Sequence, residues 1–291
     1  MKTMNIVCFG FGQVAKNFIK RLNNEKISFK LTTTSREASK NKKFDNINYE
    51  SFQLTEKNFD KNFISRLEKA DYILLSIAPI NGGDIAIKHF QNYFKPNKLK
   101  WITYLSATSV YGNHKGEWVD ERSKTKPTST NGIKRLEVEK EWTKLANKFD
   151  LPLQIFRLSG IYSNQHNILT RLKSGQAKII NKKNHFFSRI HVEDIANILF
   201  NSLNHFKKNE VYNISDDNPA SAEEVVMYGV KLLGIDRPET IEINEVESEM
   251  LKNFYKDSKK VNNKKMKEFF NYRLKYPTYI EGLNYIFNNT I

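Results

Sequence analysis

The chain has 291 residues, of which 47 are Lys or Arg and 32 are Asp or Glu, so its formal net charge is +15. This length allows one large domain or two modest ones, with a sizeable core. The 39% hydrophobic and 12% aromatic content excludes a fully disordered chain. The longest mostly apolar run, residues 72–80, is far shorter than the ~20 residues that cross a bilayer, so we expect no membrane segment. A single cysteine, Cys8, excludes a disulfide framework and indicates a reducing cytoplasm.

The excess of positive charge does not point to nucleic acid. The cations are 37 Lys and only 10 Arg, and Asn is abundant at 33 residues. Interfaces that read bases favour Arg, because its planar guanidinium binds guanine and phosphate in two places. We therefore interpret the charge as a solvated lysine-rich surface and expect no nucleic-acid partner.

Short apolar runs alternate with amphipathic segments through the first 110 residues. The expected strands are 5–9, 28–33, 47–52, 72–77 and 101–105, and the helices between them contain Val14, Phe59 and Asp84. Strand, helix and strand at this spacing imply right-handed crossovers and a parallel sheet covered on both faces. The predicted fold class is α/β, with a doubly wound parallel sheet of the Rossmann type.

The second half of the chain continues the alternation of strands and helices, which then becomes irregular. We expect helices over 132–149 and 194–203, strands over 153–158 and 211–214, and a helix that begins at Ser221 with a capping box to Glu224. The predicted organisation is a sheet domain over 1–160, to which 187–215 return. A smaller, discontinuous part occupies mainly 161–291.

A glycine-rich turn follows the first expected strand and opens a helix. In Gly10-Phe11-Gly12-Gln13-Val14-Ala15, the first glycine allows a tight turn, the second admits a pyrophosphate, and the alanine permits close packing of helix on strand. The alternative is a glycine turn without a ligand. In this context we predict a dinucleotide site formed by Gly10, Phe11, Gly12, Gln13 and Val14, with Ile77 and Ala78 at the end of a neighbouring strand.

The end of the second strand distinguishes NADP from NAD. An NAD site places Asp or Glu there to bind the ribose hydroxyls. This chain instead has Thr34, Ser35 and Arg36, which suit a 2′-phosphate. The alternative is an Arg that only stacks on adenine. We predict NADP as the cofactor, in preference to NAD.

Several further motifs resemble those of extended short-chain dehydrogenases/reductases of the NAD(P)-dependent epimerase/dehydratase superfamily. The motifs are Gly10-Phe11-Gly12, the run 105–112 (LSATSVYG), 118–121 (WVDE), 157–162 (RLSGIY), 188–194 (SRIHVED) and 212–217 (YNISDD). The resemblance covers nearly the whole chain. It implies an N-terminal domain that binds NAD(P) and a C-terminal part that binds a substrate, often a nucleotide-sugar.

The chain departs from that superfamily at its catalytic Tyr-x-x-x-Lys pair. Alignment by the flanking residues puts Asn131 at the Tyr position and Arg135 at the Lys position, and a shift of one residue gives Thr130 and Lys134. Neither register supplies a tyrosine, and Ala107 occupies the usual Ser or Thr position. Arg135 could still hold the ribose, but it cannot transfer protons.

Other residues are therefore candidates for proton transfer and substrate binding. The catalytic candidates are Ser106, Thr108, Tyr111 and His191; the substrate-binding candidates are Ser109, Asn131, Arg157, Tyr162 and Arg189. Each has a structural alternative: strand-end hydroxyls, aromatic packing, a histidine bonded to backbone, or ion pairing at the surface. No cluster of His, Asp and Glu has the spacing of metal ligands.

These residues lead to two functional hypotheses. The first is a cytoplasmic NADP-binding oxidoreductase or epimerase/dehydratase-like protein that acts on an unidentified small molecule, such as a nucleotide-sugar. The second is a redox-inactive NADP-binding sensor or regulator, which the missing tyrosine favours. The resemblance also implies a homodimer that pairs through two helices of the sheet face, one of them the helix 132–149.

Overall fold

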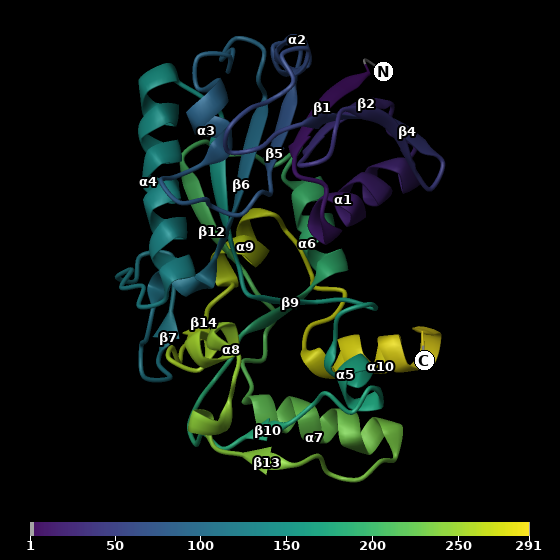
Figure 1. Ribbon diagram of the computed structural model, residues 1–291, viewed down its shortest axis with the longest axis vertical. Helices are drawn as coiled ribbons and strands as arrows, with labels where there is room; N and C mark the ends of the chain where they lie inside the picture. The colour runs from purple at the N-terminus through teal and green to yellow at the C-terminus, as the bar shows by residue number, and fades with distance from the viewer. Residues whose placement is uncertain (1–2, 291) are drawn as a thin grey trace. The chain divides into compact units, whose positions relative to one another are not determined.

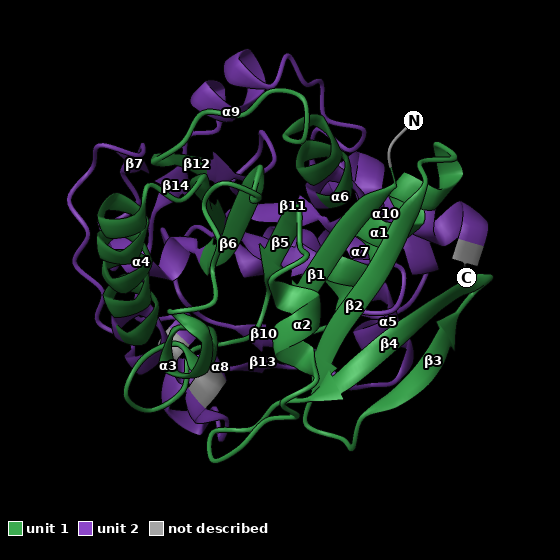
Figure 2. Cartoon of the chain, turned by 90° about the horizontal axis from the view of Figure 1, so that it is seen from above, with its two compact units in different colours: residues 1–106, 134–157, 196–212 green, residues 107–133, 158–195, 213–291 purple. Residues whose placement is uncertain are grey.

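The computed structural model describes residues 3–290, apart from the side chains of Met250, Asn253 and Thr290. It comprises two compact units, each assembled from three segments of the chain (Figure 2). Unit 1 contains residues 1–106, 134–157 and 196–212, and unit 2 contains residues 107–133, 158–195 and 213–291. Of the sheet domain expected over 1–160, residues 107–133 and 158–160 group with unit 2.

An eight-stranded sheet forms the centre of unit 1. Its order is β12-β8-β6-β5-β1-β2-β4-β3. The strands are β1 (Met4–Phe9), β2 (Phe29–Ser35), β3 (Lys40–Phe44), β4 (Ile47–Gln53), β5 (Tyr72–Leu75), β6 (Trp101–Ala107), β8 (Leu153–Leu158) and β12 (Glu210–Ile214). Strand β1 pairs in parallel with both β2 and β5, and β5 pairs in parallel with β6. Strand β3 pairs antiparallel with β4. The predicted doubly wound sheet is confirmed, and it is mostly parallel.

Helices cover both faces of this sheet (Figure 1). They are α1 (Gln13–Asn24), α2 (Phe63–Leu67), α3 (Ile85–Phe90), α4 (Thr130–Phe149) and α6 (Val192–Asn201). On one face, buried residues of α2, α3 and α4, including Phe63, Phe90 and Trp142, form a hydrophobic cluster with the strands. On the other face, Phe18 of α1 stacks on Trp101 of β6 with ring centroids 5.9 Å apart. Burial of these large aromatic rings fixes the helices on the sheet.

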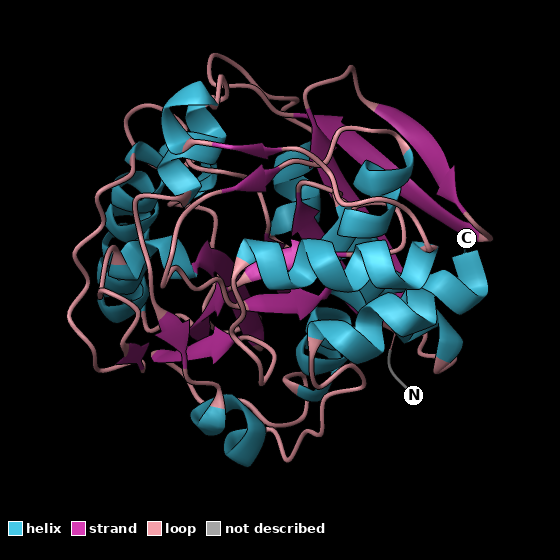
Figure 3. Cartoon of the chain, turned by 90° about the horizontal axis from the view of Figure 1, so that it is seen from below, coloured by secondary structure: helices cyan, strands magenta, loops and turns pink. Residues whose placement is uncertain are grey.

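Unit 2 consists of short strands and helices connected by loops (secondary structure in Figure 3). Its elements are η1 (Thr108–Tyr111), β7 (Trp118–Val119), β9 (Gly160–Tyr162), α5 (Ile168–Lys173), β10 (Ile179–Ile180), β11 (Arg189–His191), α7 (Ala222–Leu233), β13 (Thr240–Ile241), η2 (Ile243–Glu245), α8 (Glu249–Phe254), β14 (Lys260–Val261), α9 (Lys264–Phe269) and α10 (Tyr279–Thr290). Leu169 of α5, Val225 of α7 and Leu283 of α10 belong to one hydrophobic cluster. This cluster packs α5, α7 and α10 together.

Two local features show how well the sequence predicts individual elements. The capping box of α7 is confirmed, since the Ser221 hydroxyl accepts from the Glu224 amide and the Glu224 carboxylate accepts from the Ser221 amide. Strand β3 was not predicted, because three of its five residues are Lys and no apolar alternation marks it. Lysines suit β3 because it is the edge strand of the sheet, where charge discourages pairing with another chain. In the described part of the chain, no helix is both long and apolar enough to span a membrane.

Candidate functional site

The glycine-rich turn lies between β1 and α1 in unit 1. Gly10 has a φ of +84°, and a Cβ placed on it would lie 3.1 Å from both Ile77 Cγ1 and Ser76 Oγ. The Gly10 amide donates to Thr34 Oγ1 at 3.1 Å, which ties the turn to the end of β2. Gly12 is exposed, and no heavy atom lies within 4 Å of the position of its missing Cβ. The turn therefore has the tight bend and the open backbone that a bound pyrophosphate needs.

Phe11, between the two glycines, is held by the outer strands of the sheet. Its ring centroid lies 5.6 Å from that of Phe44 on β3 and 4.9 Å from that of Tyr49 on β4. Lys16 of α1 lies over the Phe44 ring at 5.7 Å. These contacts connect the turn to the β3–β4 hairpin and give Phe11 a packing role.

The segment after β2 carries the residues proposed to select the cofactor. Arg36 is exposed, while Ser35 is half-buried and its hydroxyl lies 3.3 Å from that of Ser51. Glu37 is bound by Lys42 and Lys40, at 2.9 and 3.2 Å. Their hydrogen bonds and positive charges lower the pKa of the Glu37 carboxyl. The acid nearest the end of β2 is thus already neutralised by two cations.

Two cations at the start of α4 have different partners inside unit 1. Arg135 Nη1 donates to the carbonyl oxygen of Leu105, at the end of β6, at 2.6 Å. Lys134 Nζ donates to Asn81 Oδ1 at 2.5 Å, in the loop that follows Ile77 and the exposed Ala78. Both registers considered for the Tyr-x-x-x-Lys pair therefore place a cation near a strand end of this sheet. The role of Arg135 toward the ribose stays a prediction.

Ser106 and Arg157 meet through Glu139, which the sequence did not single out. Ser106 Oγ donates to Glu139 Oε1 at 2.5 Å. Arg157 donates to the same carboxylate from Nε at 3.1 Å and from Nη2 at 2.7 Å. All three residues are buried, so the pairing of Arg157 is internal and not at the surface. One signal in the sequence could have indicated that Glu139 is buried: it follows Val138 on the apolar side of the helix α4.

The catalytic candidates Thr108 and Tyr111 and the substrate-binding candidates Ser109 and Asn131 lie in unit 2. Thr108 and Ser109 form part of η1 and are half-buried, whereas Asn131, at the start of α4, is exposed. Tyr111 is fully buried, and its hydroxyl donates to Asn213 Oδ1 at 2.7 Å. This geometry favours the packing alternative for Tyr111. The catalytic and substrate-binding roles of these residues stay predictions.

His191 is buried among aromatic rings in unit 2. Its ring centroid lies 5.0 Å from that of Tyr162 and 4.2 Å from that of Tyr276. Nδ1 accepts from the Glu193 amide at 3.3 Å, so that ring nitrogen is unprotonated. The pKa of His191 is lowered to about 4, chiefly by burial; the charge of Glu193 opposes this shift and that of Lys275 adds to it. A neutral histidine bonded to backbone is the structural alternative considered for this position.

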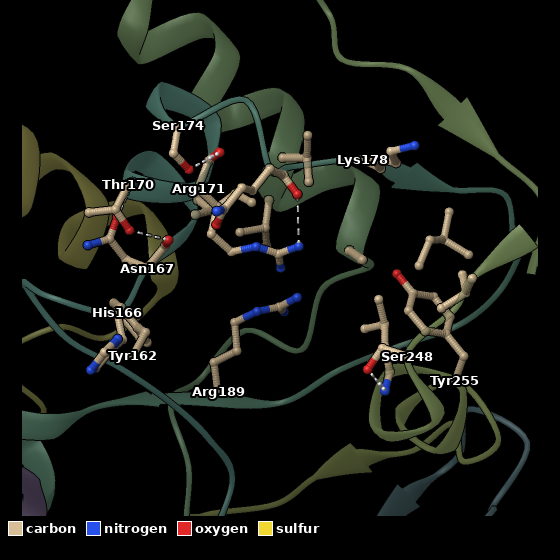
Figure 4. Close-up of a pocket in the computed structure, with 18 of the residues that line it drawn as sticks. Tyr162, His166, Asn167, Thr170, Arg171, Ser174, Lys178, Arg189, Ser248 and Tyr255 are labelled. Atoms are coloured by element: carbon tan, nitrogen blue, oxygen red, sulfur yellow. Dashed lines mark hydrogen bonds between the residues drawn. The ribbon is translucent and has the colours of Figure 1, made fainter.

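A cavity of about 820 Å³ opens within unit 2 (Figure 4). It is lined by residues of α5, β10, β11, α7 and α8, and the predicted substrate residues Tyr162 and Arg189 are among them. Arg171 and Arg189 both direct their guanidinium groups into this cavity. Arg189 Nη1 donates to the carbonyl oxygens of Phe187 and Ala220, at 2.9 and 3.0 Å. Arg171 was not predicted, because nothing in the sequence around it marks it as a ligand.

Neither arginine of this cavity has a carboxylate partner within salt-bridge distance among the described residues. Burial lowers the pKa of Arg189, and the charge of Asp216 is the largest influence that raises it. Two guanidinium groups in a cavity of this size suit an anionic small molecule. Among the residues that the structure describes, no group of three or more His, Cys, Asp and Glu is placed to hold a metal ion.

Comparison with known proteins identifies the family to which this fold belongs. The family model of the NAD dependent epimerase/dehydratase family matches residues 7–215. A functionally unknown conserved protein from Silicibacter pomeroyi is 30% identical, with 99% of each chain covered and a TM-score of 0.86. A search of the curated proteins finds no match.

Two more distant solved structures share the fold and contain NAD. The dTDP-glucose 4,6-dehydratase of Bacillus anthracis is 19% identical over 98% of this chain and 96% of that chain, with a TM-score of 0.78. The UDP-glucuronic acid 4-epimerase of Bacillus cereus is 15% identical over 98% and 96%, with a TM-score of 0.76. The resemblance inferred from the sequence motifs is confirmed, and the chain belongs to the NAD dependent epimerase/dehydratase family.

Proposed function

We propose that this protein binds NADP and acts as an oxidoreductase or epimerase/dehydratase-like enzyme on an anionic, nucleotide-sugar-like small molecule. The cofactor preference is supported by Arg36, which is exposed at the end of β2 beside Ser35. Glu37, the nearby acid, is bound by two lysines and is a poor partner for ribose hydroxyls. A guanidinium beside hydroxyls matches the charge and geometry of a 2′-phosphate.

The substrate class rests on one observation: Arg171 and Arg189 point into the same cavity, and neither has a carboxylate within salt-bridge distance among the described residues (Figure 4). A phosphate, a pyrophosphate or a sugar carboxylate would give both guanidinium groups a close anionic partner. Apolar residues such as Val225 and Leu251 and the ring of Tyr255 line other parts of the wall, as in most small-molecule sites. Two of the similar solved structures are enzymes named for the nucleotide-sugars dTDP-glucose and UDP-glucuronic acid.

The proposed chemistry must proceed without the superfamily's tyrosine. NADP, when bound, would accept or donate a hydride. Proton transfer would then use Ser106, Thr108, Tyr111, His191 or water. Ser106 already donates to Glu139, and Tyr111 to Asn213. These internal bonds favour the second candidate function, a redox-inactive NADP-binding sensor or regulator.

Thermal-shift measurements with NADPH and NADH test the cofactor proposal. We expect NADPH to stabilise the protein more strongly. Stabilisation by NADH alone would contradict the role of Arg36, and stabilisation by neither would contradict the cofactor site. Stopped-flow absorbance with NADPH, nucleotide-sugars and ketones then separates the two functions: turnover supports the enzyme, and tight NADPH binding without turnover supports the sensor.

The substrate cavity is tested with the variant Arg171→Gln. We expect it to abolish stabilisation by UDP-sugars while leaving stabilisation by NADPH intact. The matched control is Arg237→Gln, since Arg237 is an exposed arginine of unit 2 that pairs with Glu223 and does not line the cavity. An equal loss of stabilisation by UDP-sugars in both variants would contradict a specific anion site.

We also propose a cytoplasmic location and a homodimer. The location is supported by the single cysteine, Cys8, which is buried. The dimer is supported by the resemblance alone, through the helix α4. Light scattering during gel filtration measures the oligomeric state directly, and a monomer at all concentrations would contradict the proposal.

A further inference from the structure

Two Asn-Gly pairs occur in this chain, and the structure places them in opposite backbone environments. Asn81-Gly82 lies in the turn between β5 and α3, and Asn131-Gly132 lies in the first turn of α4. Asn-Gly is the pair most prone to spontaneous deamidation. The backbone nitrogen of the following residue attacks the Asn side chain, and glycine has no side chain that hinders this approach. We propose that Asn81 is a deamidation site of the folded protein and that Asn131 is protected.

The environment of Gly82 leaves its nitrogen free to react. Gly82 is exposed, and no heavy atom lies within 4 Å of the position of its missing Cβ. In the described part of the chain its amide donates no hydrogen bond; the turn is closed by the amide of Ile80, which donates to the Gly83 carbonyl at 3.0 Å. The turn around Asn81 is therefore held at its ends and open at its centre.

Gly132, in contrast to Gly82, has a closely packed backbone and a hydrogen-bonded amide. Gly132 is buried, and its amide donates to Ser129 Oγ at 3.1 Å. A Cβ on Gly132 would lie 2.7 Å from the carbonyl oxygen of Ser109, which shows how closely its backbone is packed. The helical conformation fixes the backbone of Asn131, so the Gly132 nitrogen cannot approach the Asn131 side chain.

Lys134 favours the reaction at Asn81. Its ammonium donates to Asn81 Oδ1 at 2.5 Å, and this charge-assisted bond draws electrons from the side-chain carbonyl carbon. The Gly82 nitrogen attacks Cγ of Asn81, a bond forms between them, and the bond from Cγ to Nδ2 breaks. Ammonia leaves with the former amide proton of Gly82. Water then opens the cyclic imide, which restores the nitrogen's proton and gives an aspartyl or isoaspartyl carboxylate facing Lys134.

The two sites can be compared within one tryptic digest. Cleavage after Lys69 and Lys88 gives a peptide whose single asparagine is Asn81. Cleavage after Lys124 and Lys134, with the bond before Pro127 resistant, gives a peptide whose single asparagine is Asn131. The purified full chain is incubated at mildly alkaline pH, native or in urea, and deamidation is followed by mass spectrometry.

We expect the Asn81 peptide to deamidate several-fold faster than the Asn131 peptide in the native protein, and both at similar rates in urea. Equal native rates, or no native deamidation at Asn81 while the unfolded chain reacts, would overturn the proposal. The variant Lys134→Met should slow the native reaction at Asn81, whereas Lys140→Met, an exposed lysine of the same helix, should not. An unchanged rate in Lys134→Met would overturn the role of Lys134.

A consequence for binding rests on the proposed function. The new carboxylate would add negative charge three residues after Ala78, a predicted cofactor residue, and we expect Asn81→Asp to bind NADPH several-fold more weakly. Asn147→Asp, an exposed change on α4, is the control. Equal NADPH affinities would overturn this consequence. The peptide measurement does not depend on the cofactor, so its outcome is separate from that of the proposed function.

Discussion

The carboxylate of Glu139 accepts hydrogen bonds from two nitrogens of the Arg157 guanidinium, Nε and Nη2, with both side chains less than a tenth exposed. Ser106 donates a further bond to the same carboxylate. Since these residues come from α4, β8 and β6, the cluster connects a helix to two strands of unit 1. Removing one member of a buried ion pair is strongly destabilising, because the remaining charge loses its oppositely charged partner in a place that is shielded from water.

Loss of Arg157 should therefore destabilise the protein strongly. We expect Arg157→Met to lower the free energy of unfolding by about 3 to 5 kcal/mol. Urea denaturation followed by circular dichroism measures it. The control is Arg66→Met, because Arg66 pairs with Glu50 at the surface and such pairs contribute about 1 kcal/mol or less.

Removal of both charges should lower the free energy of unfolding less than removal of one charge. The double variant Glu139→Met/Arg157→Met leaves no uncompensated charge and should recover much of the loss. A double variant as unstable as the sum of the two single variants would show that the pair itself contributes little coupling.

The parallel sheet was predictable because its strands are apolar runs separated by helices at regular spacing. The turn at Gly10 was equally visible, since its fingerprint lies between a strand and a helix. By contrast, β3 is rich in lysine and has no apolar alternation, which is possible because it is an exposed edge strand. In the sequence alone, Glu139 is indistinguishable from an exposed helix glutamate, because its partner Arg157 lies on a different element. Long-range partners of this kind depend on tertiary packing, which no local pattern records.

Arg36 should determine the choice of cofactor. The variant Arg36→Asp removes the guanidinium and adds a negative charge where a 2′-phosphate would bind. Hydrogen bonds to charged groups contribute about 1.5 to 3 kcal/mol, so NADPH affinity should fall on the order of tenfold or more, with a smaller change for NADH. Isothermal titration with both cofactors measures this. Lys43→Asp, on the nearby strand β3, controls for a general charge effect, and an unchanged preference in Arg36→Asp would remove its assigned role.

Gly282 allows α10 to pack against Tyr162. A Cβ on Gly282 would lie 2.1 Å from the Tyr162 hydroxyl oxygen and less than 3 Å from two ring carbons. Gly282→Ala should therefore lower the free energy of unfolding by about 1 to 3 kcal/mol, despite the better helix propensity of Ala. Thermal or urea denaturation measures the loss. Tyr162→Leu makes room for the methyl group, so in a protein that carries Tyr162→Leu the change Gly282→Ala should lower the free energy of unfolding clearly less. An equal loss of stability in both proteins would exclude the steric explanation.

His191 should make stability depend on pH in the acidic range. Its pKa is lowered from 6.5 to about 4 in the folded protein, chiefly by burial. Between these values the unfolded chain binds a proton that the folded chain does not, so stability falls as the pH falls, by up to about 1.4 kcal/mol for each pH unit. Above the unfolded pKa this group contributes no pH dependence.

The measurement is the urea midpoint at about pH 7 and about pH 5, compared between the parent protein and His191→Gln. His185, whose pKa burial also lowers to about 4, titrates in the same range, so the readout is the difference in slope between the two proteins and not the slope itself. We expect a shallower fall in His191→Gln, whatever its stability at neutral pH. His205→Gln, at an exposed position, should retain the full slope. If all three proteins lose stability equally on acidification, His191 is not held neutral in the folded protein.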